Sequence, residues 1–196
     1  MSVHTRKVTV ERKTSEVAIL VELNVDGIGV GKTETNIKFL GHILLTLAKH
    51  SLFDLKVKAS GDLKHHVSED VALCLGEALQ KAIAEKKGIN RFGSAYVPMD
   101  DSLARAVIDL GGRSYSVLDL KLNQPRIEDL NVEDIEHFFV SFAQASKSNL
   151  HLTVLYGSND HHKIEAAIKA LALALRQAVG LNPRIRDKIP SAKGVL

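Results

Sequence analysis

The sequence is poor in several features, and two of these shortages, of cysteine and of long apolar runs, exclude classes of protein. It has one cysteine, no tryptophan and four prolines among 196 residues. The lone Cys74 cannot form an intrachain disulfide, which favours a reducing compartment. No run of 18 apolar residues occurs, and no apolar segment follows the first methionine. We therefore predict neither a membrane-spanning helix nor a secretory signal, and expect a cytoplasmic protein that binds no membrane.

Positive and negative charges nearly balance, with 26 Lys and Arg residues against 23 Asp and Glu residues. The formal net charge is +3, and no basic run is interleaved with aromatic residues. A nucleic-acid-binding surface is therefore not predicted. Hydrophobic residues make up 45% and charged residues 25% of the chain, as in ordinary globular proteins long enough to bury a core.

One short motif occurs twice, and it dominates the sequence. Residues 65–69 read HHVSE and residues 161–165 read HHKIE, so the pattern H-H-x-x-E returns 96 positions later. A lone histidine precedes each copy, His42 by 23 positions and His137 by 24. A repeat of this kind at a fixed period indicates duplication of about half the chain.

The repeated residues are typical metal ligands. On a helix the first histidine of each motif shares a face with the glutamate four positions on, while the second histidine points about 100° away. One motif can therefore serve two metal centres, or one centre and a neighbouring subunit. Imidazole with carboxylate suits manganese, iron, cobalt, nickel or zinc, and six-coordinate Mn(II) is compatible with this set.

The rest of the pattern alternates strands with helices. Strands are predicted at 7–14, 16–25, 33–38, 53–60, 95–99, 102–110, 113–122 and 149–156, and helices at 39–50, 65–85, from 132 onward, and at 160–179. Gly27–Thr33 resembles a phosphate-binding P-loop, but Asp26 stands where its first glycine is needed. We interpret Asp26-Gly27 as a hairpin turn into a returning strand.

These elements predict an α+β fold made of two similar halves. Each half would be a four-stranded antiparallel sheet with two helices packed on one face. Within each half, the lone-histidine helix would pack beside the H-H-x-x-E helix that follows it. We place the halves at 1–92 and 93–180, followed by a tail at 181–196.

Further motifs follow one another over nearly the whole chain. They are RKTSE (12–16), FLGH (39–42), HHVSED (65–70), KGINRFG (87–93), DLGGR (109–113), EHFF (136–139), HHKIEA (161–166) and SAKGVL (191–196). In this order they resemble the imidazoleglycerol-phosphate dehydratase family of histidine biosynthesis. The resemblance implies the fold class named after the second domain of a small-subunit ribosomal protein. It also implies a shell of 24 identical subunits with metal sites between them and two Mn²⁺ per subunit.

The family's site residues carry over position by position. The implied metal ligands are His42, His65, His66, Glu69, His137, His161, His162 and Glu165. The implied substrate-binding residues are Glu16, His42, His50, His65, Arg91, Arg113, Lys169, Ser191 and Lys193. Arginine suits a phosphate because its fork binds two oxygens at once.

The implied reaction turns imidazole glycerol phosphate into imidazole acetol phosphate and water. A metal bound to the substrate imidazole favours its imidazolate, which can expel the C3 hydroxyl through a diazafulvene-like intermediate. Glu16 is the candidate catalytic residue that shuttles the proton. The chain departs from the family at Gly41, where Asp is usual, at Thr46, where Gln is usual, and in a short stretch before His65. These departures bear on the support of His42 and on one polar substrate contact.

Two other functions compete with this one. A non-catalytic shell assembled by His/Glu metal sites would need no phosphate site, so Glu16, Arg91, Arg113 and Lys193 argue against it. A metal-dependent hydrolase would favour a motif such as H-E-x-x-H, which is absent.

Overall fold

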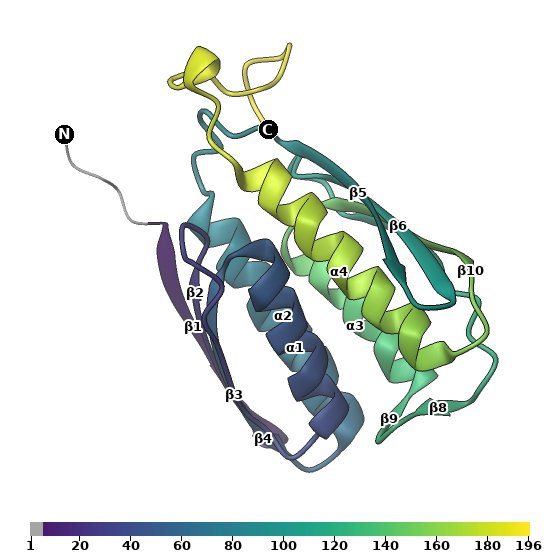
Figure 1. Ribbon diagram of the computed structural model, residues 1–196. Coiled ribbons are helices and arrows are strands. Elements are labelled where there is room, and N and C mark those ends of the chain that lie inside the picture. The colour runs from purple at the N-terminus through teal and green to yellow at the C-terminus, as the bar shows by residue number, and fades with distance from the viewer. Residues whose placement is uncertain (1–5) are drawn as a thin grey trace.

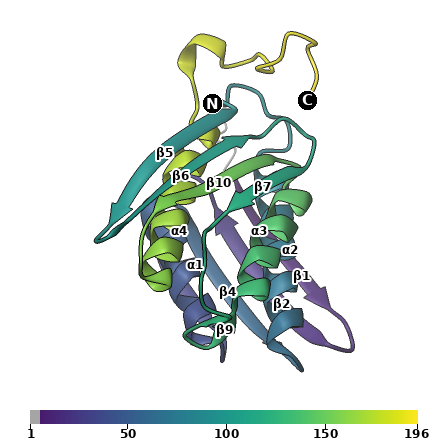
Figure 2. The ribbon, with the colours of Figure 1, turned by 90° about the vertical axis from the view of Figure 1, so that its right-hand side faces the viewer.

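Two four-stranded sheets enclose four helices (Figure 1 and Figure 2). The computed structural model describes residues 6–196, so residues 1–5 of the predicted first half lie outside it. Each sheet turns one face to two helices and the other face outward, which confirms the predicted α+β class and the two similar halves. The predicted boundaries at 92/93 and 180/181 stay predictions.

The first half forms one sheet with two helices. Its strand order is β1-β2-β4-β3. Every second residue of β2 is buried, from Val17 to Leu23, because alternate side chains of a strand point to the same face. Its elements are β1 (Lys7–Lys13), β2 (Val17–Asn24), β3 (Gly31–Glu34), α1 (Lys38–Ser51), β4 (Asp54–Gly61) and α2 (Lys64–Ala82).

The second half repeats this plan, with strand order β5-β6-β10-β7. It adds a short hairpin between its third strand and its first helix. Its elements are β5 (Phe92–Met99), β6 (Ser102–Asp109), β7 (Tyr115–Asp119), β8 (Arg126–Ile127), β9 (Leu130–Asn131), α3 (Val132–Ala145), β10 (Asn149–Tyr156) and α4 (Asp160–Val179). A short 3-10 helix (Pro183–Ile185) follows in the tail.

The sheets are mixed, so the prediction of antiparallel sheets is wrong in one pairing of each sheet. β3 pairs parallel with β4, and β7 pairs parallel with β10. The predicted hairpin after Asp26-Gly27 is also wrong, because β4 lies between β2 and β3. The cause is the β3-α1-β4 connection, since a helical crossover returns the chain parallel to the strand it left. The strand predicted at 33–38 is β3, and at Lys38 the chain is already helical.

The closest helix packing joins the two halves. α2 packs on α3 and α1 packs on α4, so each lone-histidine helix has its main helix contact with the H-H-x-x-E helix of the other half. Gly76 lets α2 approach α3, because a side-chain carbon there would lie 2.6 Å from the carbonyl oxygen of Phe142. The predicted pairing within a half therefore misses the principal helix contact.

The fold bears on the lone cysteine and on the question of membrane-spanning helices. Cys74 is 1% exposed among apolar residues, as predicted. No helix among residues 6–196 has the length and apolar character needed to cross a bilayer. The predicted cytoplasmic location stays a prediction.

Candidate functional site

The first candidate metal site joins α1 to α4, and we call it the α1/α4 cluster. It consists of His42, His161 and Glu165, with one ligand atom from each lying within 4.8 Å of the others. The Nε2 atoms of both histidines lie 3.4 Å from Oε2 of Glu165. His161 and Glu165 are four positions apart, so they share one face of α4, as the motif predicts.

The second candidate site, the α2/α3 cluster, is built in the same way. It consists of His65, Glu69 and His137. The Nε2 of His65 lies 3.8 Å from Oε2 of Glu69, and the Nε2 of His137 lies 3.6 Å from Oε1 of Glu69. Each cluster thus takes two ligands from a repeated motif and one from the lone-histidine helix of the other half.

The second histidine of each motif belongs to neither cluster. The Nδ1 of His66 lies 2.8 Å from Asp62, between β4 and α2, and 4.0 Å from Glu16 in the β1–β2 turn. The hydrogen bond with Asp62 raises the pKa of His66. His162 faces the β5–β6 turn, and its Nδ1 lies 2.7 Å from Asp101.

All four motif histidines have Nδ1 beside a carboxylate. Besides these two contacts, Nδ1 of His65 lies 2.7 Å from Asp134, and Nδ1 of His161 lies 3.1 Å from Glu128. A carboxylate on Nδ1 leaves Nε2 free as a metal ligand and fixes the ring. Imidazole nitrogens with a carboxylate oxygen fit a divalent metal such as Mn²⁺, so the residues present suit the implied ion.

Sequence reasoning missed these carboxylates. Asp134 is 69 positions from His65, Asp101 is 61 positions from His162 and Glu128 is 33 positions from His161. No local spacing signals such a contact. Only Asp62, four positions before His66, could have been found from helical periodicity.

Two predicted substrate-binding residues lie beside the α1/α4 cluster. The Nζ of Lys169, one turn along α4, lies 2.7 Å from Oε1 of Glu165. Burial raises the pKa of Glu165, but hydrogen bonds from Lys169 and His42 outweigh burial and lower the pKa overall. Burial, together with the nearby Lys169 charge, lowers the pKa of His50. These groups form a polar patch next to the ligands.

Four other predicted residues lie at the opposite end of the molecule. They are Arg91, Arg113, Ser191 and Lys193, and the end of the tail that carries the last two lies against Gly112. The backbone N–H of Arg91 donates to the carbonyl of Ala178, near the end of α4. Glu165 lies 13 positions before Ala178, which is about 20 Å along a helix. One chain therefore does not bring these four residues to its own metal clusters.

Arg91 has partners within the chain. Its Nε donates to Oδ1 of Asp109 at 2.6 Å, a second nitrogen donates to Oδ2, and a third donates to the Pro190 carbonyl. The hydrogen bond with Asp109 raises the pKa of Arg91. Arg91 therefore ties the end of β6 to the C-terminal tail.

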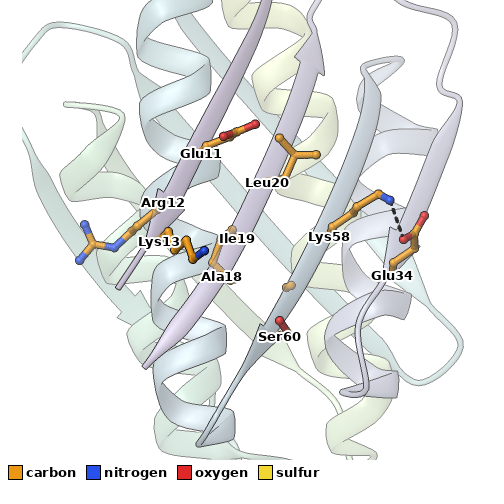
Figure 3. Close-up of a pocket in the computed structure, with 10 residues that line it drawn as sticks. Glu11, Arg12, Lys13, Ala18, Ile19, Leu20, Glu34, Lys58 and Ser60 are labelled. Atoms are coloured by element: carbon orange, nitrogen blue, oxygen red, sulfur yellow. Dashed lines mark ion pairs between the residues drawn. The ribbon is translucent and has the colours of Figure 1, made fainter. Parts of the chain in front are cut away.

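A hollow of about 450 Å³ on the outer face of the first sheet is separate from both clusters (Figure 3). Residues of β1, β2, β3 and β4 line it, including Glu11, Leu20 and Lys58. Lys58 is paired with Glu34 at 3.0 Å. No predicted site residue lines this hollow.

Comparison with known proteins agrees with the motifs. The family model for imidazoleglycerol-phosphate dehydratase matches residues 35–175. The imidazoleglycerol-phosphate dehydratase of Roseiflexus sp. is 48% identical over 100% of both chains. That of Zymomonas mobilis is 47% identical over 97% of this chain and 99% of its own.

Two solved structures share the fold. The dehydratase of Pyrococcus furiosus, crystallised in complex with (S)-C348, superposes with a TM-score of 0.83 at 35% identity. The match covers 95% of this chain and 100% of that one. The Staphylococcus aureus enzyme gives a TM-score of 0.80 at 31% identity, over 89% and 100% of the two chains. The chain belongs to the imidazoleglycerol-phosphate dehydratase family, and it is therefore a lyase of histidine biosynthesis.

Proposed function

We propose that the chain is a metal-dependent enzyme that converts imidazole glycerol phosphate to imidazole acetol phosphate and water. The observation that carries the proposal is the pair of His/Glu clusters, one between α1 and α4 and the other between α2 and α3. We propose Mn²⁺ as the ion and two ions per subunit, one for each cluster. The proposed ligands are the eight histidines and glutamates of the two motifs and the two lone-histidine helices.

We propose that complete sites form between subunits. Each cluster offers three ligands from one chain, and a six-coordinate ion has room for more. His66 and His162 lie at turns outside their own clusters, so they are the candidates to complete clusters of neighbouring chains. The separation of about 20 Å between Glu165 and the tail end of α4 also favours a site shared by two chains. A 24-subunit shell, as the family resemblance implies, would bring further metal ligands from a neighbouring chain and would also bring a neighbouring tail to the clusters.

In the proposed reaction, His42, His161 and Glu165 or His65, Glu69 and His137 would hold the metal, which would supply Lewis acidity to the substrate imidazole. The chain's own carboxylates divide between two tasks. Glu69 and Glu165 hold metal, and Glu16 moves the proton from the substrate carbon. Glu16 is suited to this task because its side chain is 55% exposed and lies at 4.0 Å from His66, beside the proposed site of a neighbouring chain.

The substrate phosphate needs cations and hydrogen-bond donors. We propose Arg113, Ser191 and Lys193 as its ligands, with Arg91 fixing the tail that carries two of them. Lys169 and His50 would contact the substrate from the α1/α4 side. On this proposal residues 181–196 act as a functional tail on the two halves at 1–92 and 93–180.

One of the departures from the family, Gly41, lies next to a proposed metal ligand, His42. Gly41 lies in α1, where a side-chain carbon would meet the hydroxyl of Thr33 at 3.2 Å. The carboxylate missing there bears on the support of His42, whose Nε2 nevertheless lies 3.4 Å from Oε2 of Glu165 in the α1/α4 cluster. We propose that the first cluster remains competent to bind metal despite the departure.

Light scattering before and after chelation tests the proposal. We expect particles of about two dozen chains that dissociate with EDTA and reassemble with Mn²⁺. The assembled protein should then release water from imidazole glycerol phosphate. Particles that assemble without turning over substrate would support the shell alternative. A monomer or dimer indifferent to EDTA would contradict the intersubunit sites.

A further inference from the structure

The segment that joins β7 to α3, residues 120–131, is an unusual feature of the second half. We call it the connector. The matching link of the first half, between β3 and α1, has only three residues, whereas the connector has twelve and contains the β8–β9 hairpin. In Figure 1 this hairpin lies at the end of the helix layer opposite the C-terminal tail.

The connector contacts the first turns of α1 and α2 through Asp129. Its carboxylate accepts hydrogen bonds from the backbone N–H groups of Lys38 and Phe39, at 2.8 and 2.9 Å. The residue before α1, Ile37, provides no side-chain cap, so Asp129 replaces one from 90 positions away. The Nζ of Lys64, the first residue of α2, donates to the carbonyl oxygen of Asp129 at 2.6 Å.

The connector also holds the first turn of α4. The carboxylate of Asp160 accepts the backbone N–H groups of Asn123 and Gln124, both at 2.8 Å. The buried Nζ of Lys163 donates to the carbonyl of Lys121 at 2.7 Å. At the hairpin tip Glu128 contacts His161.

The end of the connector leads into α3 and reaches the other cluster. Asn131 donates to Asp134 at 3.2 Å, and Asp134 contacts Nδ1 of His65. Glu128 has a φ of +53°, a left-handed conformation that is strained for a residue other than glycine. Neighbouring contacts must stabilise the hairpin enough to offset this strain.

We propose that the connector is a clamp that holds the N-terminal ends of all four helices in register, so that both metal clusters are pre-formed in a single chain. Every cluster ligand lies in the first two turns of its helix, where helices fray most readily. A metal site needs its ligands held to within about 0.5 Å, so fraying at one helix start would disperse a cluster. Asp129 and Glu128 act on the ligands only by positioning them.

Hydrogen exchange on the metal-free full-length chain tests the clamp directly. In Asp129→Ala, the first-turn amides of α1 should exchange about fivefold faster, the effect of losing a helix cap. Asp129→Asn should restore part of the protection, because its amide oxygen can still accept one of the two N–H groups. Glu11→Gln, an exposed carboxylate of β1, is the matched control and should change nothing. Unchanged exchange in Asp129→Ala would overturn the clamp.

A second variant separates positioning from general stability. Glu128→Gly removes the contact with His161 and also relieves the positive φ, so thermal stability of the metal-free protein should be equal or higher. Manganese affinity, measured by counting free Mn²⁺ by electron paramagnetic resonance, should nevertheless fall about tenfold at one of the two sites. Unchanged affinity would exclude Glu128 from the clamp.

This second test rests on the proposed metal sites, whereas the exchange test needs neither metal nor substrate. If wild-type protein bound no Mn²⁺, the proposed function would fail while the exchange result still decided the clamp.

Discussion

His42 and Glu165 stand 123 positions apart in the chain, yet Nε2 of one lies 3.4 Å from Oε2 of the other. One comes from the first half and the other from the second. The same contact occurs with the halves exchanged. Nε2 of His137, from the second half, lies 3.6 Å from Oε1 of Glu69, from the first half. Neither half holds a cluster by itself, so the duplication produces two candidate metal sites only when α1 packs on α4 and α2 packs on α3.

Removing one lone histidine should therefore abolish metal binding at one cluster and leave metal binding at the other unchanged. We expect His42→Ala and His137→Ala each to lower the metal content from two ions per chain to one, measured by elemental analysis. Turnover of imidazole glycerol phosphate should fall more than about a hundredfold, since even the loss of a group behind a ligand costs about 10–100-fold. His151→Ala, on the exposed side of β10, is the control. Two ions retained in His42→Ala would contradict the cross-half cluster.

The sequence predicts much of this arrangement because the signals are local. The α4 range of 160–179 and the β10 range of 149–156 agree with the structure at both ends, since helical and strand periodicity lie within each segment. The repeated motif likewise places two ligands on one helix face. Strand order and helix partners are different, because they depend on contacts between segments far apart in the chain. The parallel pairing of β3 with β4 and the packing of α1 on α4 had no local signal.

Asp101 positions His162 and should affect metal binding without touching metal. Its carboxylate also accepts the backbone N–H of Asn159 and the hydroxyl of Ser158. The hydrogen bond with His162 holds the pKa of Asp101 well below its usual range, so Asp101 remains ionised in moderately acidic solution. We expect Asp101→Asn to weaken Mn²⁺ binding about 10–100-fold and to raise the Mn²⁺ concentration needed for assembly. Asp119→Asn, exposed on β7, should leave the light-scattering titration unchanged.

Arg91 joins β6 to the tail, because two of its nitrogens donate to Asp109 and a third donates to the Pro190 carbonyl. A lysine offers a single ammonium and cannot reproduce the two bonds to Asp109 together with the bond to Pro190. In Arg91→Lys we expect faster proteolysis of residues 181–196 and a KM for substrate raised about tenfold, the effect of losing about one strong hydrogen bond. Metal content should stay unchanged, because the clusters lie at the other end of the helices. Arg105→Lys on β6 is the control, and an unchanged KM in Arg91→Lys would exclude the anchoring role.

Cys74 should be inert in the folded protein. Its side chain lies in the core, and burial raises its pKa to about 11. The folded state therefore favours the neutral thiol, so stability is constant below the unfolded pKa of about 8.5 and falls as pH rises from there toward 11. We expect no labelling by a thiol reagent at pH 8 in the native state and rapid labelling in urea. Rapid labelling of the native protein would show that the α2 core opens.

Lys163 carries the most deeply buried charge of the second motif. Its side chain is 1% exposed, and its Nζ lies 2.7 Å from Asp160, whose side chain is 5% exposed. Lys163→Met would leave Asp160 without its counter-ion, so the free energy of unfolding should fall by about 3–5 kcal/mol in urea titrations. Lys163→Met combined with Asp160→Asn should recover part of this loss, because no unpaired charge would remain buried. Lys81→Met breaks the half-exposed pair with Glu77 and should cost less than about 1 kcal/mol. Equal losses in Lys163→Met and Lys81→Met would show that the buried pair contributes no more than a surface one.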